Sequence, residues 1–250
     1  FSNLKTFKEA KKNNKFIPFR GPINKKTLSC AEDLEYKIIE NDKYGFKNSN
    51  SIYEKKINVI LLGASHAEGF CYTSENDIAG NLIKKKINTL NLGVAATGPL
   101  VSLAVLKEFG PLYKPKNIIY LYFESNNLDF LKWEKEDKYL IKYLKKDHRN
   151  NYTDRLSEIE DFLDSIEKES IKIAKVRANQ VQPRNKDKEA YFIANIRDIL
   201  EINILRSKFK KFFLSKNPAH DLNLFFDIVY EMKAESQKLN AKFIFVYVPN

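Results

Sequence analysis

Three short apolar runs constrain the fold of this chain most strongly. They are INVILL (57–62), KNIIYLYFE (116–124) and AKFIFVYVP (241–249), and all three are rich in β-branched or aromatic residues. Such runs are typical of parallel strands that are buried on both faces of a sheet. INTLNLG (87–93) adds a shorter strand. Because helical patterns separate these strands, the sequence predicts an α/β fold with a central parallel sheet.

The segments between the strands indicate how the chain is divided. Residues 76–87 and 99–109 have helical patterns, and the second helix has Pro99 in its first turn. The mostly helical stretch from Asn127 to about Leu239 is too long for one crossover, so we expect a helical insertion over about 132–220. Residues 1–50 are irregular and contain aromatics to bury, which predicts an N-terminal arm packed on an α/β domain of residues 51–250.

Composition bounds the possible partners. The net charge of +11 permits nucleic acid, anionic glycans or a membrane surface. No long basic run or nucleic-acid-binding signature accompanies this charge, so we expect no nucleic-acid partner. No apolar run reaches the roughly 18 residues that a membrane span needs. Cys30 and Cys71 leave two possibilities open, a disulfide typical of an oxidising compartment or two free thiols.

Three strand ends carry residues suited to acyl transfer. They read GAS (63–65), NLG (91–93) and ESNN (124–127). The carboxyl ends of parallel strands form the ligand crevice of an open sheet. Ser65 would be the nucleophile, and its own N–H, the Gly93 N–H and the Asn126 amide would stabilise the oxyanion. Two other roles stay open: Ser65 as a small residue in a tight turn, and Asn126 as a helix N-cap.

These blocks resemble the SGNH (GDSL-type) hydrolases. GASHAEG (63–69) matches the family's Gly-Asp-Ser block and its second glycine, with Ala64 in place of the aspartate. NLGV (91–94) resembles the second block, and SNN (125–127) keeps the asparagine of the third at Asn126. YGFKN (44–48) and GPL (98–100) are similar to bacterial members linked to surface polysaccharides. The resemblance covers roughly residues 30–131 and the last strand.

The resemblance implies a fold and an activity. The fold would be a three-layer sandwich around a flavodoxin-like parallel sheet. The activity would be that of a serine esterase or O-acyltransferase acting on acyl groups, acetyl in particular, of a glycan or another small ester, with Ser65, Gly93 and Asn126 at the site and without metal or cofactor. The location would be extracytoplasmic or membrane-associated, through an anchor before Phe1, with the bacterial cytoplasm as the alternative.

The family's catalytic base is not found in this sequence. The base is a histidine with an aspartate three residues before it, and none of His66, His148 and His220 has that aspartate. We therefore expect the Asp/His pair beyond Asn250 and a chain truncated at its C-terminus. Ala64 and the missing base also favour an alternative, a non-catalytic module that binds a glycan or a protein. Hydrolysis versus transfer and the oligomeric state are left open.

Overall fold

The computed structural model describes residue 9 and residues 20–29, 37–124, 127–180 and 218–249. The chain divides into two compact units. The larger unit spans residues 18–156 and 218–250 and contains both sheets. The smaller unit spans residues 1–17 and 157–217, and nearly all of its described part belongs to one long helix, α6 (Leu156–Gln180). The predicted helix at about 189–214 lies outside the described residues.

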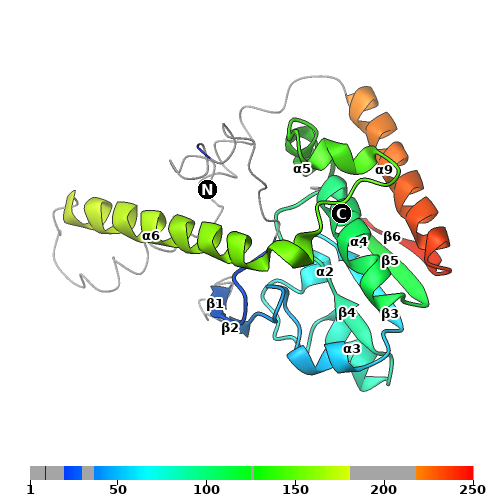
Figure 1. The fold of residues 1–250 in the computed structure, drawn as a ribbon, viewed down its shortest axis with the longest axis horizontal. Coiled ribbons are helices and arrows are strands. Elements are labelled where there is room, and N and C mark those ends of the chain that lie inside the picture. The colour runs from blue at the N-terminus through cyan, green and yellow to red at the C-terminus, as the bar shows by residue number, and fades with distance from the viewer. Residues whose placement is uncertain (1–8, 10–19, 30–36, 125–126, 181–217, 250) are drawn as a thin grey trace. The chain divides into compact units, whose positions relative to one another are not determined.

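A parallel sheet of four strands in the order β4-β3-β5-β6 organises the larger unit (Figure 1). Every residue of the central strand β3 is buried, as its apolar sequence predicts. The predicted α/β fold with a central parallel sheet is therefore confirmed. The strands are β3 (Val59–Gly63), β4 (Thr89–Asn91), β5 (Asn117–Phe123) and β6 (Lys242–Val248).

Helices cover both faces of this sheet. On one face, Leu61 packs with Ala67 of α2 and Ala79 of α3. On the other face, the ring of Tyr122 lies 4.8 Å from that of Phe225 in α9. Leu121, which precedes Tyr122, belongs to the first cluster, and neighbouring side chains of a strand point to opposite faces. The helices are α2 (Ser65–Glu68), α3 (Ile78–Lys84), α4 (Pro99–Tyr113), α5 (Asn127–Glu134) and α9 (Pro218–Lys238).

The segment before β3 packs against this core. An antiparallel pair, β1 (Lys26–Ser29) with β2 (Lys37–Glu40), leads into a turn and then into the 3-10 helix η1 (Asn50–Glu54). The Phe46 ring lies 5.1 Å from that of Phe109 in α4, in an edge-to-face arrangement. Phe46 of the turn is therefore buried on α4.

The helical run after Asn127 is less continuous than its amphipathic sequence suggests. Helix α5 ends at Glu134, and two 3-10 helices follow, η2 (Leu140–Leu144) and η3 (Tyr152–Arg155). The Asp137 carboxylate accepts hydrogen bonds from the N–H groups of Tyr139 and Leu140, at 2.9 and 3.2 Å. It thus starts a new turn where the helix would otherwise have continued.

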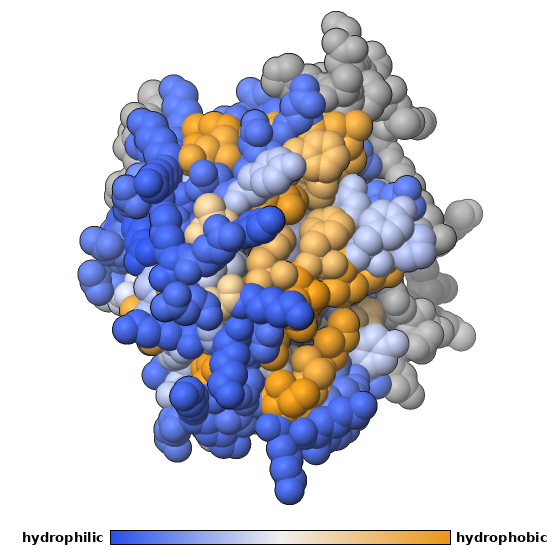
Figure 2. Space-filling model, turned by 90° about the vertical axis from the view of Figure 1, so that its right-hand side faces the viewer, coloured by the Kyte–Doolittle hydropathy of each residue, from blue (hydrophilic) through white to orange (hydrophobic). Residues whose placement is uncertain are grey.

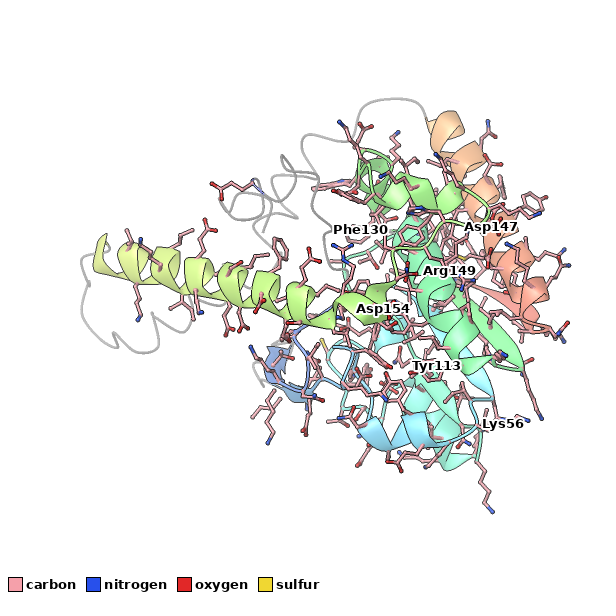
Figure 3. All side chains as sticks on the ribbon, in the orientation of Figure 1. Lys56, Tyr113, Phe130, Asp147, Arg149 and Asp154 are labelled. Atoms are coloured by element: carbon pink, nitrogen blue, oxygen red, sulfur yellow. The ribbon has the colours of Figure 1, made fainter. Side chains whose placement is uncertain are left out.

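The connection after η2 lies along α4 and α9 (Figure 3). The buried Lys107 ammonium of α4 donates to the carbonyl of Lys145 at 2.8 Å. Arg149 faces Glu235 of α9 at 3.9 Å. Charged groups therefore fix this connection to the two helices on that face of the sheet.

Apolar side chains gather on the side of the unit that carries α9 and β6 (Figure 2). Phe226 and Tyr230 of α9 are exposed, as are Phe245 and Tyr247 of β6. Among the described strands, β6 pairs with β5 alone. No helix in the described part of the chain is both long and apolar enough to cross a membrane.

Candidate active site

Ser65 follows the central strand at the carboxyl edge of the sheet. The next strand in sequence, β4, lies on one side of β3, and the one after it, β5, lies on the other side. The direction in which strands are added therefore reverses between β3 and β5. Open α/β sheets bind ligands at such a point. Gly63 makes the turn: its φ is 142°, and a Cβ there would lie 2.6 Å from the Leu121 carbonyl oxygen. The half-buried Ser65 makes no side-chain hydrogen bond to any described residue. Among the described residues, none occupies this hydroxyl.

Gly93 lies directly against the Ser65 helix. A Cβ at Gly93 would come within 2.4 Å of the Glu68 nitrogen and 2.7 Å of the Ala67 carbonyl carbon. The Val94 N–H also donates to the Gly63 carbonyl at 3.0 Å. The structure therefore brings the ends of β3 and β4 together, as the sequence predicts. The Gly93 N–H donates to the Asn91 side-chain oxygen at 3.0 Å, so it would have to leave that acceptor to bind an oxyanion.

The end of β5 is described up to Glu124, and Asn126 lies outside the described residues. The His66 ring packs on the Phe123 ring, with 4.1 Å between the centroids. The buried Asn127 closes this strand end: its side-chain oxygen accepts from the Phe123 N–H at 3.2 Å, and its amide donates to the Tyr120 hydroxyl at 3.3 Å. Asn127 directly follows Asn126, the asparagine predicted for the site. Nothing in the sequence indicated that Asn127 would hold the end of β5 in this way.

A buried ion pair between Lys47 and Asp77 stabilises the C-terminal end of α2, the helix that begins at Ser65. The Lys47 ammonium donates to the carbonyl oxygens of Gly69 and Glu68, at 2.6 and 3.3 Å. It also lies 3.4 Å from the Asp77 carboxylate, and the two side chains are only 2% and 1% exposed. Burial lowers the pKa of Lys47 and raises that of Asp77, while their mutual attraction opposes both shifts. Asp77 also caps α3 by accepting from the Gly80 N–H at 2.7 Å.

Two asparagines extend this support to the segment before β3. The Asn91 amide donates to the Ala67 carbonyl at 2.9 Å. Asn48 in turn accepts from the Asn91 N–H and donates to the Asn91 carbonyl, both at 2.9 Å. The Asn48 amide also reaches the buried Asp42 carboxylate at 2.8 Å, and the Tyr53 hydroxyl donates to the same carboxylate at 2.6 Å. The segment from 42 to 48 therefore braces the turn that carries the serine.

Sequence reasoning assigned none of these supporting residues a role. YGFKN (44–48) marked the right segment, but a lysine is normally expected at the surface, so the burial of Lys47 was not foreseen. The reason for its burial is visible only in the structure: the Lys47 ammonium donates to carbonyl oxygens at the end of α2 that have no intrahelical partner.

Glu68 connects the Ser65 helix to the loop after β4. Its Oε2 accepts a hydrogen bond from the Ala95 N–H at 2.8 Å. Burial raises the pKa of Glu68 to about 7, although the Ala95 N–H and the nearby Lys47 charge both act to lower it. A carboxyl group that titrates near neutral pH thus lies three residues from Ser65, where the sequence suggested no acid or base.

Neither described histidine side chain is bonded to the serine. His66 is exposed, whereas His148 lies 5.1 Å from the Tyr143 ring, with its pKa lowered by burial. His220 is in the first turn of α9, and its side chain is not described. In the described ranges, no three His, Cys, Asp or Glu residues are arranged to hold a metal ion.

Cys71 lies three residues after α2 and is disulfide-bonded. Its φ of 74° is in the left-handed region. Cys30 is the only other cysteine in the sequence, and it lies outside the described residues. The pairing of Cys30 with Cys71 therefore stays a prediction.

Comparison with known proteins assigns no family to this chain. No family model matches it, and no curated protein or solved structure matches it significantly. Function therefore has to be inferred from the residues at the sheet edge and from the resemblance of their sequence blocks.

Proposed function

We propose that this chain carries an SGNH-type site for ester chemistry, in which Ser65 attacks an acyl group. One observation carries the proposal: a half-buried serine without a hydrogen-bond partner among the described residues follows the central strand, next to the Gly93 loop. The strand order β4-β3-β5-β6 also agrees with the first four strands of a flavodoxin-like sheet, the finer fold that we propose.

The mechanism follows from the groups at this edge. Ser65 would attack the acyl carbonyl carbon to give an acyl-serine, which water hydrolyses or a second alcohol accepts. As the first residue of α2, Ser65 has a backbone N–H without an intrahelical acceptor. This N–H, the Gly93 N–H and the Asn126 amide would stabilise the oxyanion, and loss of one such donor typically lowers the rate by about 10²–10³.

The sequence resemblance supports the substrate class and the location. We propose an acylated glycan, acetylated above all, as substrate, and an extracytoplasmic or membrane-associated site of action. The same resemblance supplies a proton acceptor only on an Asp/His pair beyond Asn250. The proposed chemistry needs no metal or organic cofactor.

The second candidate is a non-catalytic module that binds a glycan or a protein. The hydrogen bond from the Gly93 N–H to Asn91 favours it, because that bond uses a donor that an oxyanion hole requires. Ala64, in place of the family's aspartate, favours it as well.

Acetate release distinguishes the two candidates. The protein, with any sequence beyond Asn250 included, and its Ser65→Ala variant would be incubated with an O-acetylated polysaccharide, and free acetate would be measured over time. Release by the wild type that the variant loses supports ester chemistry. Equal binding of the polysaccharide by both proteins, without acetate release, supports the binding module.

A further inference from the structure

The four residues of α2 point in different directions around a single helical turn. Ala67 is buried against the sheet, next to Gly63 and Gly93. His66 packs on Phe123 at the β5 side. The carboxylate of Glu68 lies on the β4 side, where it accepts from the loop after that strand. Successive helix positions are about 100° apart, so Ser65 lies opposite Ala67, between the directions of His66 and Glu68.

Of these two neighbours, only Glu68 is spaced to meet Ser65. Residues three apart on a helix have Cβ atoms about 5–6 Å apart and share a face, whereas adjacent residues diverge. Oε2 of Glu68 is occupied by the Ala95 N–H, but no described residue donates to Oε1. One oxygen of this carboxylate is thus left to accept a proton.

The charged groups around Glu68 do not occupy that oxygen. Lys47 approaches from the segment before β3, and its hydrogen bonds go to the backbone carbonyls of Glu68 and Gly69. Asp77, at the start of α3, pairs with Lys47. From the loop after β4 only the Ala95 N–H reaches the carboxylate. On α2 itself, His66 is turned toward β5.

We propose that Glu68 is the proton acceptor for Ser65, so that the described chain holds its own catalytic base. This inference rests on the proposed function and replaces the histidine expected beyond Asn250 in the same role. In such a site a carboxylate, in place of a histidine, activates the serine hydroxyl.

The step balances without a further reactant. Ser65 Oγ bonds to the acyl carbon while its proton passes to Glu68 Oε1, directly or through one water, and the carbonyl electrons form the oxyanion. When the tetrahedral intermediate collapses, the bond to the leaving alkoxide breaks, and the alkoxide takes the proton from Glu68. Water then attacks the acyl-serine by the same route, with Glu68 as base and Ser65 Oγ as leaving group.

The environment of Glu68 suits this role. Ser65 and Glu68 share no direct hydrogen bond in the structure, which is common for catalytic pairs before substrate binds. Its pKa of about 7 leaves much of the carboxylate ionised at neutral pH, yet basic enough to take a proton. An ordinary surface glutamate would be a far weaker base.

The test uses p-nitrophenyl acetate and four proteins. The wild type, Glu68→Gln, His66→Gln and Ser65→Ala would be compared by kcat/KM between pH 5 and 9. Gln keeps an oxygen that can accept from the Ala95 N–H, so Glu68→Gln removes the base but not the hydrogen bond. We expect the wild-type rate to rise with pH around a midpoint near 7, and Glu68→Gln to lose about 10²–10⁴-fold. His66→Gln should behave as the wild type.

Each other result has a defined meaning. If Glu68→Gln is as active as the wild type while Ser65→Ala is inactive, the inference is overturned and the proposed function survives. Loss of activity in His66→Gln alone also overturns it. Ester hydrolysis that Ser65→Ala retains overturns both. Should Glu68→Gln fail to fold, Glu68→Asp provides the test: the carboxylate is withdrawn by one carbon, and an unchanged rate would refute the inference.

Discussion

Replacement of Lys47 by methionine is the most informative test of the buried support beneath Ser65. Methionine fills a similar volume but donates no hydrogen bond. In Lys47→Met, the Asp77 carboxylate would lose the ammonium at 3.4 Å. The carbonyls of Glu68 and Gly69 would each lose one of two donors and keep the Asn91 amide at 3.3 Å and the Tyr72 N–H at 3.0 Å, respectively. Since both side chains are almost fully buried, water cannot replace the lost ammonium as a partner of the Asp77 carboxylate.

The expected loss follows from this geometry. Removing one partner of a buried ion pair destabilises a protein by about 3–5 kcal/mol, because the other charge is left buried and unpaired. The two carbonyls each keep a second donor, so their loss adds less than the roughly 1–3 kcal/mol that a buried group without any partner would cost. We therefore expect the free energy of unfolding to fall by at least about 3 kcal/mol, a large share of the total of about 5–15 kcal/mol.

Urea unfolding measures this loss directly. The only tryptophan, Trp133, lies in α5 of the larger unit, so its fluorescence follows the unit that contains the sheet. Lys132→Met is the matched control: its partner Asp129 is at 2.8 Å but largely exposed, so we expect a loss below about 1 kcal/mol. A Lys47→Met loss no larger than this control would refute the reasoning.

Three further predictions concern the same edge of the sheet. Gly93→Ala places a Cβ 2.4 Å from the Glu68 nitrogen, so urea unfolding should show a loss of about 1–3 kcal/mol; a gain would show that the loop moves freely. For Glu68, the native state retains a proton between about pH 4.5 and 7 that the unfolded chain has released. The stability of the wild type relative to Glu68→Gln should therefore fall as pH rises from 5 to 8, and a constant difference would contradict the raised pKa. Because Cys71 is bonded, a thiol reagent should label no cysteine in the denatured, unreduced protein, and two labelled thiols would exclude the disulfide.

The sheet was predictable because its signal is local. Apolar runs that end in glycine or a polar turn specify parallel strands, and all four predicted strands form. The predicted burial on both faces is wrong for β6: none of its residues is buried, because among the described strands it pairs with β5 alone. Helix α3 (Ile78–Lys84) is shorter than the predicted helix over 76–87. At its N-terminal end the reason is that Asp77 takes the N-cap position. Such capping contacts move the ends of a helix but do not change how many helices form.

The support beneath the site was not predictable, because it joins residues far apart in sequence. Lys47 and Asp77 are thirty positions apart, and neither stands in a motif that marks a buried pair. The hydrogen bond between Gly93 and Asn91 was also not foreseen, because spacing alone does not say whether a backbone N–H is free. Glu68 had a local clue, its position three residues after Ser65, but its burial depends on the loop after β4.

The central claim is that Ser65 is an activated nucleophile, and covalent labelling tests it most directly. The protein would be treated with a fluorophosphonate, digested and mapped by mass spectrometry, with Ser65→Ala as control. The account predicts one adduct, on the peptide that contains Ser65, and none in the variant. No adduct on Ser65, or equal modification of the variant, would contradict the account and favour a binding module.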